Sequence, residues 1–204
     1  MVKIKLNYMV LLTGINKIKT AVFISGTGSN LKSLIKFSKL NKSPISINLI
    51  ITNNKLAKGL KYGDIFKIKK KIIYFKNKEI AEKKILNELE INKIELVCLA
   101  GFMKILSKNF IKNFKGKILN IHPSLLPKYK GLNTHRRAIE NKDKFSGATV
   151  HFVNTKLDSG KIILQKKVRI LKSDTEKTLA KKVLKIEHKL YPAAIEKIIK
   201  RSSL

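Results

Sequence analysis

Short apolar runs recur along the chain and alternate with segments of helical periodicity. Strands are predicted over residues 21–25, 45–51, 71–75, 94–100 and 117–121, each with a run of apolar side chains. Helices are predicted over residues 31–38, 77–89 and 107–114, with a short basic helix over residues 55–64. This alternation predicts an α/β, Rossmann-like fold with a mostly parallel twisted sheet and helices on both faces.

The pattern changes after residue 147. Residues 147–153 alternate, with Thr149 and His151 on one face and Val150 on the other, as in a strand. Residues 161–168 read as its hairpin partner, so an antiparallel C-terminal edge is expected. Residues 173–176 form a capping-box sequence that opens the last helix, and Pro192 is expected to kink or restart that helix.

The first predicted strand runs into a glycine-rich turn, Gly26-Thr27-Gly28-Ser29-Asn30, with Ser29 or Asn30 as the expected N-cap of the next helix. A strand, a glycine turn and a helix N-terminus together present backbone N–H groups to a phosphate. Many such turns need glycine only for steric reasons, so both interpretations stay open. Ligands of parallel sheets bind at the carboxyl ends of the strands, where Gly28, Gly101 and residues 120–122 all lie. These positions predict one shared site.

The densest group of reactive side chains lies between residues 120 and 160. It holds three of the four histidines, together with Asp158 and half of the prolines. Proline at positions 123 and 127 indicates an ordered, non-helical loop directly after Asn120 and His122. An amide, an imidazole and a carboxylate suit the stabilisation of an oxyanion and the movement of a proton during acyl-type transfer.

Three other interpretations of this segment were weighed. Ser124 as a hydrolase nucleophile lacks the Gly-x-Ser-x-Gly setting. A metal site is conceivable, but its candidate ligands show no short helical or turn spacing; they are His122, His135, His151 and Asp158. The third interpretation is a polar loop with purely structural histidines.

Length and composition are those of one globular domain. The 204 residues suffice to bury about 70% of the unfolded surface, and 44% of them are hydrophobic. We expect residues 1–18 to be an extension of unknown order and residues 19–204 to be a single domain. The single cysteine, Cys98, allows no internal disulfide and suggests a reducing compartment. No run of about 18 apolar residues is present, so the chain is expected to be cytoplasmic, without a membrane segment.

The net charge of +32 comes from 45 Lys and Arg residues against 13 Asp and Glu. The basic residues are spread over the whole chain, and no aromatic interleaving or RNA-binding motif accompanies them. A surface for nucleic acid and a compositional bias without a dedicated partner are both compatible with this charge. We expect nucleic-acid binding to be non-specific.

Four sequence motifs, in order along the chain, carry a family resemblance. They are residues 24–30 (ISGTGSN), 99–106 (LAGFMKIL), 120–127 (NIHPSLLP) and 147–160. With these motifs the chain resembles the monofunctional, folate-dependent phosphoribosylglycinamide formyltransferase family from about residue 19 to residue 199. The resemblance implies transfer of a formyl group from 10-formyltetrahydrofolate to the amine of glycinamide ribonucleotide in purine synthesis. It implies two small-molecule substrates, no metal, and a monomer or homodimer.

The family motifs also imply roles for single residues. The implied catalytic residues are Asn120, His122 and Asp158. The implied ribonucleotide-binding residues are Gly28, Ser29, Asn30 and Glu187. The implied folate-binding residues are Lys78, Met103, Lys104, Ile105, Leu106 and Asn120, with the 155–160 loop beside them. Asn120 and His122 would stabilise the tetrahedral oxyanion, while Asp158 would keep His122 protonated and assist proton transfer.

Some positions depart from the family pattern. Asn133 and Thr155 replace a usual histidine and a usual acidic residue, and Lys78 and Lys104 stand where arginine is common. Lysine cannot hold a carboxylate in the bidentate manner of arginine, so folate binding could be weaker.

Three rival functions were considered. Methionyl-tRNA formyltransferase carries a C-terminal domain, which we do not expect in a chain of 204 residues. Formyltetrahydrofolate deformylase carries an N-terminal regulatory domain that we do not expect here. A nucleic-acid-binding module is disfavoured by the intact catalytic trio.

Overall fold

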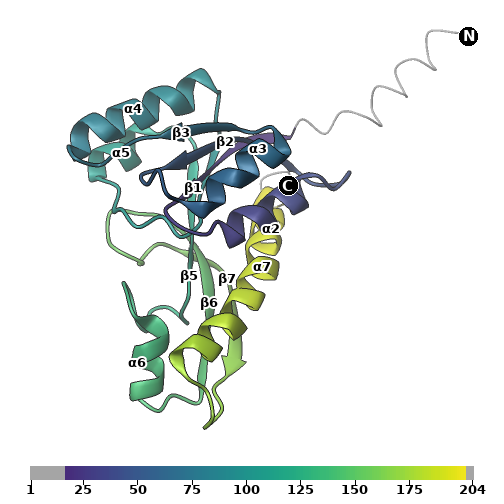
Figure 1. Cartoon of the computed structure of the whole chain (residues 1–204), viewed down its shortest axis with the longest axis vertical. Coiled ribbons are helices and arrows are strands. Elements are labelled where there is room, and N and C mark those ends of the chain that lie inside the picture. The colour runs from purple at the N-terminus through teal and green to yellow at the C-terminus, as the bar shows by residue number, and fades with distance from the viewer. Residues whose placement is uncertain (1–16, 201–204) are drawn as a thin grey trace, which may run out of the picture.

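The structure is a computed structural model that describes residues 17–200. Its centre is a seven-stranded sheet in the order β3-β2-β1-β4-β5-β6-β7 (Figure 1). The strands are β1 (Ile18–Ile24), β2 (Ile45–Thr52), β3 (Lys69–Ile72), β4 (Leu96–Leu99), β5 (Lys117–His122), β6 (Phe145–Phe152) and β7 (Ile162–Arg169). The first five strands are parallel, and β6 and β7 are antiparallel to their neighbours. The predicted α/β fold with an antiparallel C-terminal edge is confirmed.

Helices cover both faces of the sheet. They are α2 (Ser29–Ser38), the 3-10 helix η1 (Lys58–Leu60), α3 (Lys61–Phe66), α4 (Lys78–Ile91), α5 (Lys108–Asn113), α6 (Thr134–Glu140) and α7 (Glu176–Lys200). Helices α2 and α7 pack side by side on one face, where they share a core cluster with Val22 and Val150. Helices α4 and α5 cover the other face with Phe23 and Val97. Two apolar layers therefore hold the strands from which the site is built.

The third strand begins two residues earlier than predicted and ends at Ile72, not Phe75. It is the outermost strand beside β2, and its lysines pair with the backbone of residues 49–51. Pairing with β2 thus sets its bounds, while the apolar run 72–75 continues past the strand to bury Ile73 and part of Phe75.

The last helix continues through Pro192 in one span of 25 residues, so of the two predicted effects of Pro192 the restart is wrong. The neighbouring residues Tyr191 and Ala194 are buried and hold the helix against the sheet.

The expected capping box of residues 173–176 is displaced. The Thr175 hydroxyl accepts a hydrogen bond from the Thr178 N–H at 3.2 Å, and the Thr178 hydroxyl accepts from the Thr175 N–H at 2.9 Å. Asp174 instead accepts from Lys182, at 2.6 Å, so its charge holds the side of the helix.

Two long-range contacts fix the strands that carry the candidate residues. The hydroxyl of Tyr191 lies 3.1 Å from the carbonyl oxygens of both Leu99 and Leu119, so α7 is attached to β4 and β5. In the antiparallel pair, Asn120 stands opposite His151, which brings the two side chains to one face of the sheet.

Residues 1–16 lie outside the described part of the chain, and so does most of the predicted 1–18 extension. Strand β1 already begins at Ile18. Over residues 17–200, no helix has both the length and the apolar character needed to cross a lipid bilayer.

Candidate active site

The turn between β1 and α2 is closely packed against a second turn. Gly28 has φ 72°, and a Cβ on it would lie 2.6 Å from Cα of Gly59. Only glycine fits this conformation and this approach. Gly28 is also the N-cap of α2, without a side-chain capping bond, which corrects the prediction of Ser29 or Asn30. The first N–H groups of α2 therefore have no side-chain cap and are available to an anion.

Asn30 faces inward from this turn. Its side-chain amide donates to the Glu187 carboxylate of α7 at 2.6 Å, and both residues are 7% exposed. Burial raises the pKa of Glu187, and the Asn30 hydrogen bond only partly opposes that shift. The oxygen Oδ1 of Asn30 is buried without a partner. The structure thus joins two of the predicted ribonucleotide-binding residues. Because the Asn30 side-chain amide is engaged by Glu187, only the backbone N–H of Asn30 is placed to bind a phosphate.

The predicted catalytic trio is assembled around one carboxylate. His122 Nδ1 lies 3.4 Å from Asp158 Oδ2, and the Asn120 side-chain amide donates to Asp158 Oδ1 at 3.3 Å. The side chains of His122 and Asp158 are each 7% exposed. His151 is a fourth member, with Nε2 3.7 Å from Asp158 Oδ1 and 3.3 Å from the Asn120 amide nitrogen.

Backbone groups of the loop after β5 complete this cluster. The Tyr129 carbonyl lies 2.8 Å from His122 Nε2, so that nitrogen carries a proton. The Gly131 N–H donates to Asp158 Oδ2 at 2.9 Å. The loop is itself held by the Tyr129 hydroxyl, which donates to Asp143 at 2.8 Å. Asp158 has φ 44°, a left-handed conformation that its surroundings impose.

The pKa of His122 reflects two opposing influences, and the proposed role of Asp158 in keeping this ring protonated stays a prediction. Burial lowers the pKa of His122, and the attractions of the Tyr129 carbonyl and Asp158 do not fully compensate. Burial would also raise the pKa of Asp158, but His151, the Gly131 N–H and His122 together lower it. The unliganded cluster therefore holds an ionised carboxylate beside an imidazole whose charged form is penalised by burial.

This arrangement is suited to a reaction in which negative charge appears and disappears. The two ring nitrogens of His122 face the Tyr129 carbonyl and the Asp158 carboxylate, so a doubly protonated ring could donate to both. Burial opposes the positive charge that this form carries. A developing oxyanion nearby would supply the charge that offsets the burial penalty. The Asn120 amide adds a donor that needs no change of protonation.

The predicted folate-binding residues lie in three places: residues 103–106 follow β4, Lys78 is the first residue of α4, and Asn120 lies in β5. Met103 and Ile105 are 64% and 65% exposed, and Lys78 and Lys104 are exposed as well. Leu106 is 7% exposed and belongs to the core under α4 and α5. Asn120 is half-buried. The roles of these residues in binding remain predictions.

The alternative interpretations fare differently. The Ser124 hydroxyl donates to the Lys128 carbonyl at 2.6 Å and the residue is 1% exposed, so it serves the loop. His135 lies in α6 with its Nδ1 buried and unpartnered. Within residues 17–200, no three His, Cys, Asp or Glu side chains are placed to hold a metal ion.

Sequence reasoning missed the parts played by His151 and Tyr129. His151 was placed on a strand face and named only as a conceivable metal ligand, and its contact with Asp158 depends on the β5–β6 register. The face shared by Thr149, His151 and Val153 was a usable signal, because alternate residues point the same way. Tyr129 acts through its carbonyl, which no side-chain pattern reveals.

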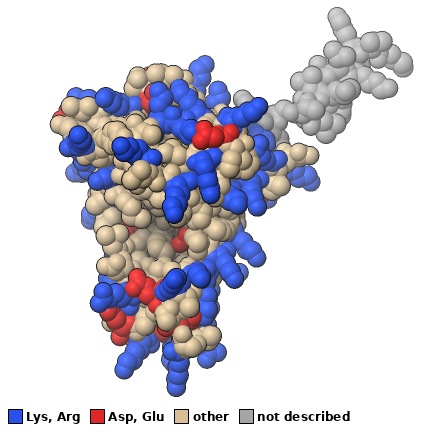
Figure 2. All heavy atoms as spheres, viewed as in Figure 1, with Lys and Arg blue, Asp and Glu red and all other residues tan. Residues whose placement is uncertain are grey.

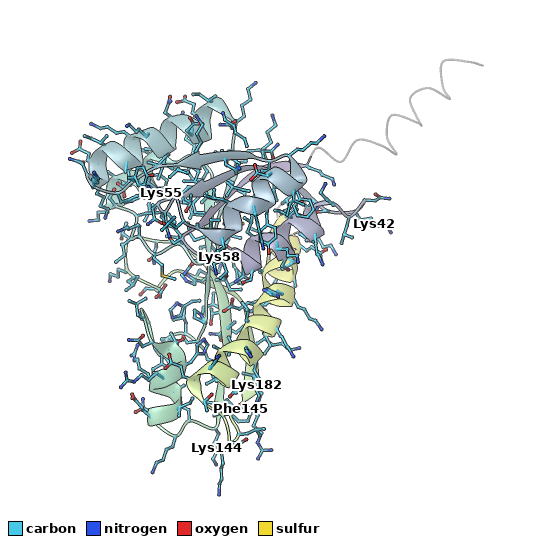
Figure 3. All side chains as sticks on the ribbon, viewed as in Figure 1. Lys42, Lys55, Lys58, Lys144, Phe145 and Lys182 are labelled. Atoms are coloured by element: carbon cyan, nitrogen blue, oxygen red, sulfur yellow. The ribbon has the colours of Figure 1, made fainter. Side chains whose placement is uncertain are left out.

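Lys and Arg side chains are spread over the face of the molecule that Figure 2 shows. Figure 2 shows a hollow near the middle of the face in view, with Lys and Arg side chains above and below it. Lys42, Lys55 and Lys58 lie in the upper half of Figure 3, and Lys144 and Lys182 in the lower half. On the face in view, the basic residues are not gathered into one patch.

Comparison with known proteins agrees with this geometry. Residues 18–195 match the family model described as formyl transferase. The Escherichia coli phosphoribosylglycinamide formyltransferase is 41% identical over 177 residues, covering 85% of this chain and 84% of that protein. The solved phosphoribosylglycinamide formyltransferase of Brucella melitensis superimposes with a TM-score of 0.85 at 41% identity, covering 90% of this chain and 96% of the other.

A longer relative matches through one part only. The trifunctional purine biosynthetic protein adenosine-3 of Gallus gallus is 42% identical over 187 residues, covering 89% of this chain. The chain spans 18% of that protein's length.

Proposed function

The chain belongs to the formyl transferase family, and we propose that it is a phosphoribosylglycinamide formyltransferase. It transfers the formyl group of 10-formyltetrahydrofolate to the amine of glycinamide ribonucleotide in de novo purine biosynthesis. The observation that carries this proposal is the convergence of Asn120, His122 and Asp158 within hydrogen-bonding and ion-pair distances at the carboxyl end of the sheet.

The ribonucleotide binds across the β1–α2 turn and α7. Its phosphate is held by the backbone N–H groups at Gly28, Ser29 and Asn30, where the helix N-terminus favours an anion. Its ribose is held by Glu187, whose carboxylate is already fixed by Asn30 at 2.6 Å. A ribose hydroxyl donating to this carboxylate would stabilise the charged form that burial disfavours.

The folate binds beside residues 103–106. The exposed side chains of Met103 and Ile105 offer apolar contact to the ring system, and Leu106 supports the segment from the core. Lys78 and Lys104 are the cations assigned to the acidic end of the folate, and Asn120 reaches the formyl group from β5. The 155–160 loop covers the other side, with Asp158 at its inner end.

The reaction proceeds by addition and elimination. The neutral amine attacks the formyl carbon, and the carbonyl oxygen becomes an oxyanion that Asn120 and protonated His122 stabilise. Asp158 offsets the charge of His122 while the amine proton moves to the departing folate nitrogen. Collapse of the tetrahedral intermediate releases tetrahydrofolate and the formylated ribonucleotide, with no covalent bond to the protein.

The remaining properties follow the family resemblance. We propose a cytoplasmic enzyme that uses 10-formyltetrahydrofolate as co-substrate, requires no metal and acts as a monomer or homodimer. Its basic surface binds nucleic acid only through phosphate charge. Such binding weakens steeply with salt and shows no preference for sequence.

The direct test is conversion of 10-formyltetrahydrofolate to tetrahydrofolate by the purified protein. We expect conversion only when glycinamide ribonucleotide is present, with the formylated ribonucleotide formed in equal amount. Conversion without ribonucleotide would indicate a deformylase. Formylation of methionyl-tRNA, with selective tRNA binding at physiological salt, would favour the tRNA enzyme and overturn the proposal.

A further inference from the structure

Three turns at the carboxyl ends of β1, β2 and β4 meet at one serine. Ser25 is the first residue after β1, and its hydroxyl accepts a hydrogen bond from the Met103 N–H at 2.8 Å. The same hydroxyl donates to the Asn53 side-chain oxygen at 2.5 Å. One oxygen thus connects the phosphate turn to the segment after β4 and to the segment after β2.

The backbone of Ser25 reinforces these connections. Its N–H donates to the Gly101 carbonyl at 3.0 Å, and its carbonyl accepts from the Asn54 side chain at 3.2 Å. One residue later, the Gly26 carbonyl accepts from the Gly59 N–H at 3.0 Å. Through these bonds Ser25 is attached to the segment after β4 on one side and to the segment after β2 on the other.

Packing fixes only part of the segment after β4. Phe102 contacts the rings of Phe23 and Phe75 edge to face, and Leu106 is buried. Met103 and Ile105 are more than half exposed, and the Gly101 backbone, with φ 75°, has open space where a side chain would stand. At Met103 itself the side chain adds little restraint, and the hydrogen bond from the Met103 N–H to Ser25 Oγ holds this peptide in place.

We propose that Ser25 is a positioning residue that holds the ribonucleotide turn and the folate segment in fixed register. This inference rests on the proposed function, because residues 28–30 and 103–106 hold the two substrates only if that function is correct. Formyl transfer requires the amine and the formyl carbon at near-contact distance. An error of about 1 Å in their relative placement can slow such a reaction by about 10²-fold.

The Ser25→Ala variant removes both hydroxyl bonds and keeps the backbone bonds. We expect kcat to fall at least about tenfold. The dissociation constants of glycinamide ribonucleotide and of tetrahydrofolate, each measured alone by calorimetry, should change by less than about threefold, because each ligand keeps its own turn. If Ser25 had only a structural role, Ser25→Ala would lower the unfolding temperature, but it would not lower kcat while leaving both dissociation constants unchanged.

Two further variants sharpen the result. Ser25→Thr retains the hydroxyl and should restore at least half of the lost kcat. Ser25 borders an open pocket of about 550 Å³, lined also by Leu56 and Tyr74, which offers space beside this side chain. Ser46→Ala is the matched control. Ser46 is a half-buried serine whose hydroxyl donates to the Asn48 side-chain oxygen at 2.8 Å, near the opposite end of the neighbouring strand.

Backbone amide NMR shifts of the unliganded protein separate the two proposals. Ser25→Ala should move the amide signals of both 28–30 and 103–105, and Ser46→Ala should move neither set. An inactive wild-type protein would overturn the proposed function, and the amide shifts would then decide the connection on their own. A kcat in Ser25→Ala equal to that in Ser46→Ala, or amide changes confined to 25–30, would overturn the positioning role.

Discussion

Asp158 and Glu187 are both carboxylates enclosed by the fold, yet their surroundings give them opposite properties. Asp158 lies among two histidines, the Asn120 amide and the Gly131 N–H, and its pKa is lowered although burial acts to raise it. Among residues 17–200, the side chain of Glu187 is hydrogen-bonded by the Asn30 amide, and burial raises its pKa. Burial acts to raise the pKa of both carboxyl groups, so the number and charge of their partners determine the direction of the pKa shift.

The comparison separates chemistry from binding. Groups that can take up a proton surround Asp158, so charge can move within that cluster during a reaction. The neutral amide beside Glu187 does not titrate, so no second titratable group exchanges a proton with this carboxylate, and the pair is suited to orienting a ligand. We assign the first region to transfer and the second to recognition of the ribonucleotide.

The largest effect is expected at the chemical cluster. His122→Ala should lower kcat by at least about 10²-fold, the low end for loss of a positioned acid. Combined with Asp158→Asn, the loss should be smaller than the product of the two single losses, because the pair acts as one unit. Steady-state kinetics of the three variants measures this. Independent, multiplicative losses would separate His122 from Asp158 and break the first half of the comparison.

A smaller effect is expected on the binding side. Gly28→Ala would bring its Cβ to 2.6 Å from the Gly59 backbone, displacing the turn that presents the helix N–H groups. The KM of the ribonucleotide should rise by about tenfold, which corresponds to a loss of about 1.4 kcal/mol of binding free energy. The KM of the folate should change little.

Gly101→Ala is the control for backbone strain. It has a similar φ of 75° and no atom within 4 Å of the added Cβ. It should lower the unfolding temperature and leave the KM of the ribonucleotide unchanged. Equal effects of both variants on that KM would show that strain, and not the turn's position, is responsible.

Glu187→Gln tests the raised pKa through stability. Because the folded state binds this proton more tightly than the unfolded state, wild-type stability is highest below the unfolded pKa and falls as pH rises through the folded pKa. The variant carries no charge, so it should unfold at a higher temperature than the wild type near pH 8. A gain of 1 kcal/mol corresponds to roughly 2–4 °C in a chain of this size.

The difference between the two proteins should shrink toward pH 4, where Glu187 is protonated in both states. Thermal unfolding followed at several pH values gives both quantities. A variant less stable than wild type at pH 8 would mean that Glu187 is not penalised by burial.

The smallest expected effect concerns the titration of His122. Burial places its pKa below that of an ordinary histidine, and the Asp158 charge partly restores it. In Asp158→Asn the His122 ring should therefore titrate at still lower pH. NMR of the histidine ring protons in the unliganded protein measures this directly. A higher titration point in the variant would contradict the attraction between the two groups.

The fold was predictable from local patterns where those patterns also decide the structure. Asn77 begins α4 as expected, and its side chain accepts from the Ile80 N–H at 3.0 Å. The bounds of β3 were not predictable, because an outer strand takes its bounds from its neighbour. Similarly, Gly28 replaces the polar N-cap because the close approach of Gly59 leaves no space for a side chain.

The site was predictable in its members but less so in its electrostatics. Asn120, His122 and Asp158 were named from sequence, and the structure brings them together. The sign of the His122 shift depends on how far the loop at Tyr129 encloses the ring, and the role of His151 depends on strand register. Both are long-range properties that no local motif carries.

One measurement tests the separation of the two carboxylates most directly. It is the single-turnover rate of formyl transfer at saturating concentrations of both substrates, for Asp158→Asn and Glu187→Gln against wild type. The account predicts a rate at least about 10²-fold slower for Asp158→Asn. It also predicts a rate within about threefold of wild type for Glu187→Gln, once its weaker ribonucleotide binding is saturated. Equal losses in the two variants, or a larger loss in Glu187→Gln, would contradict it.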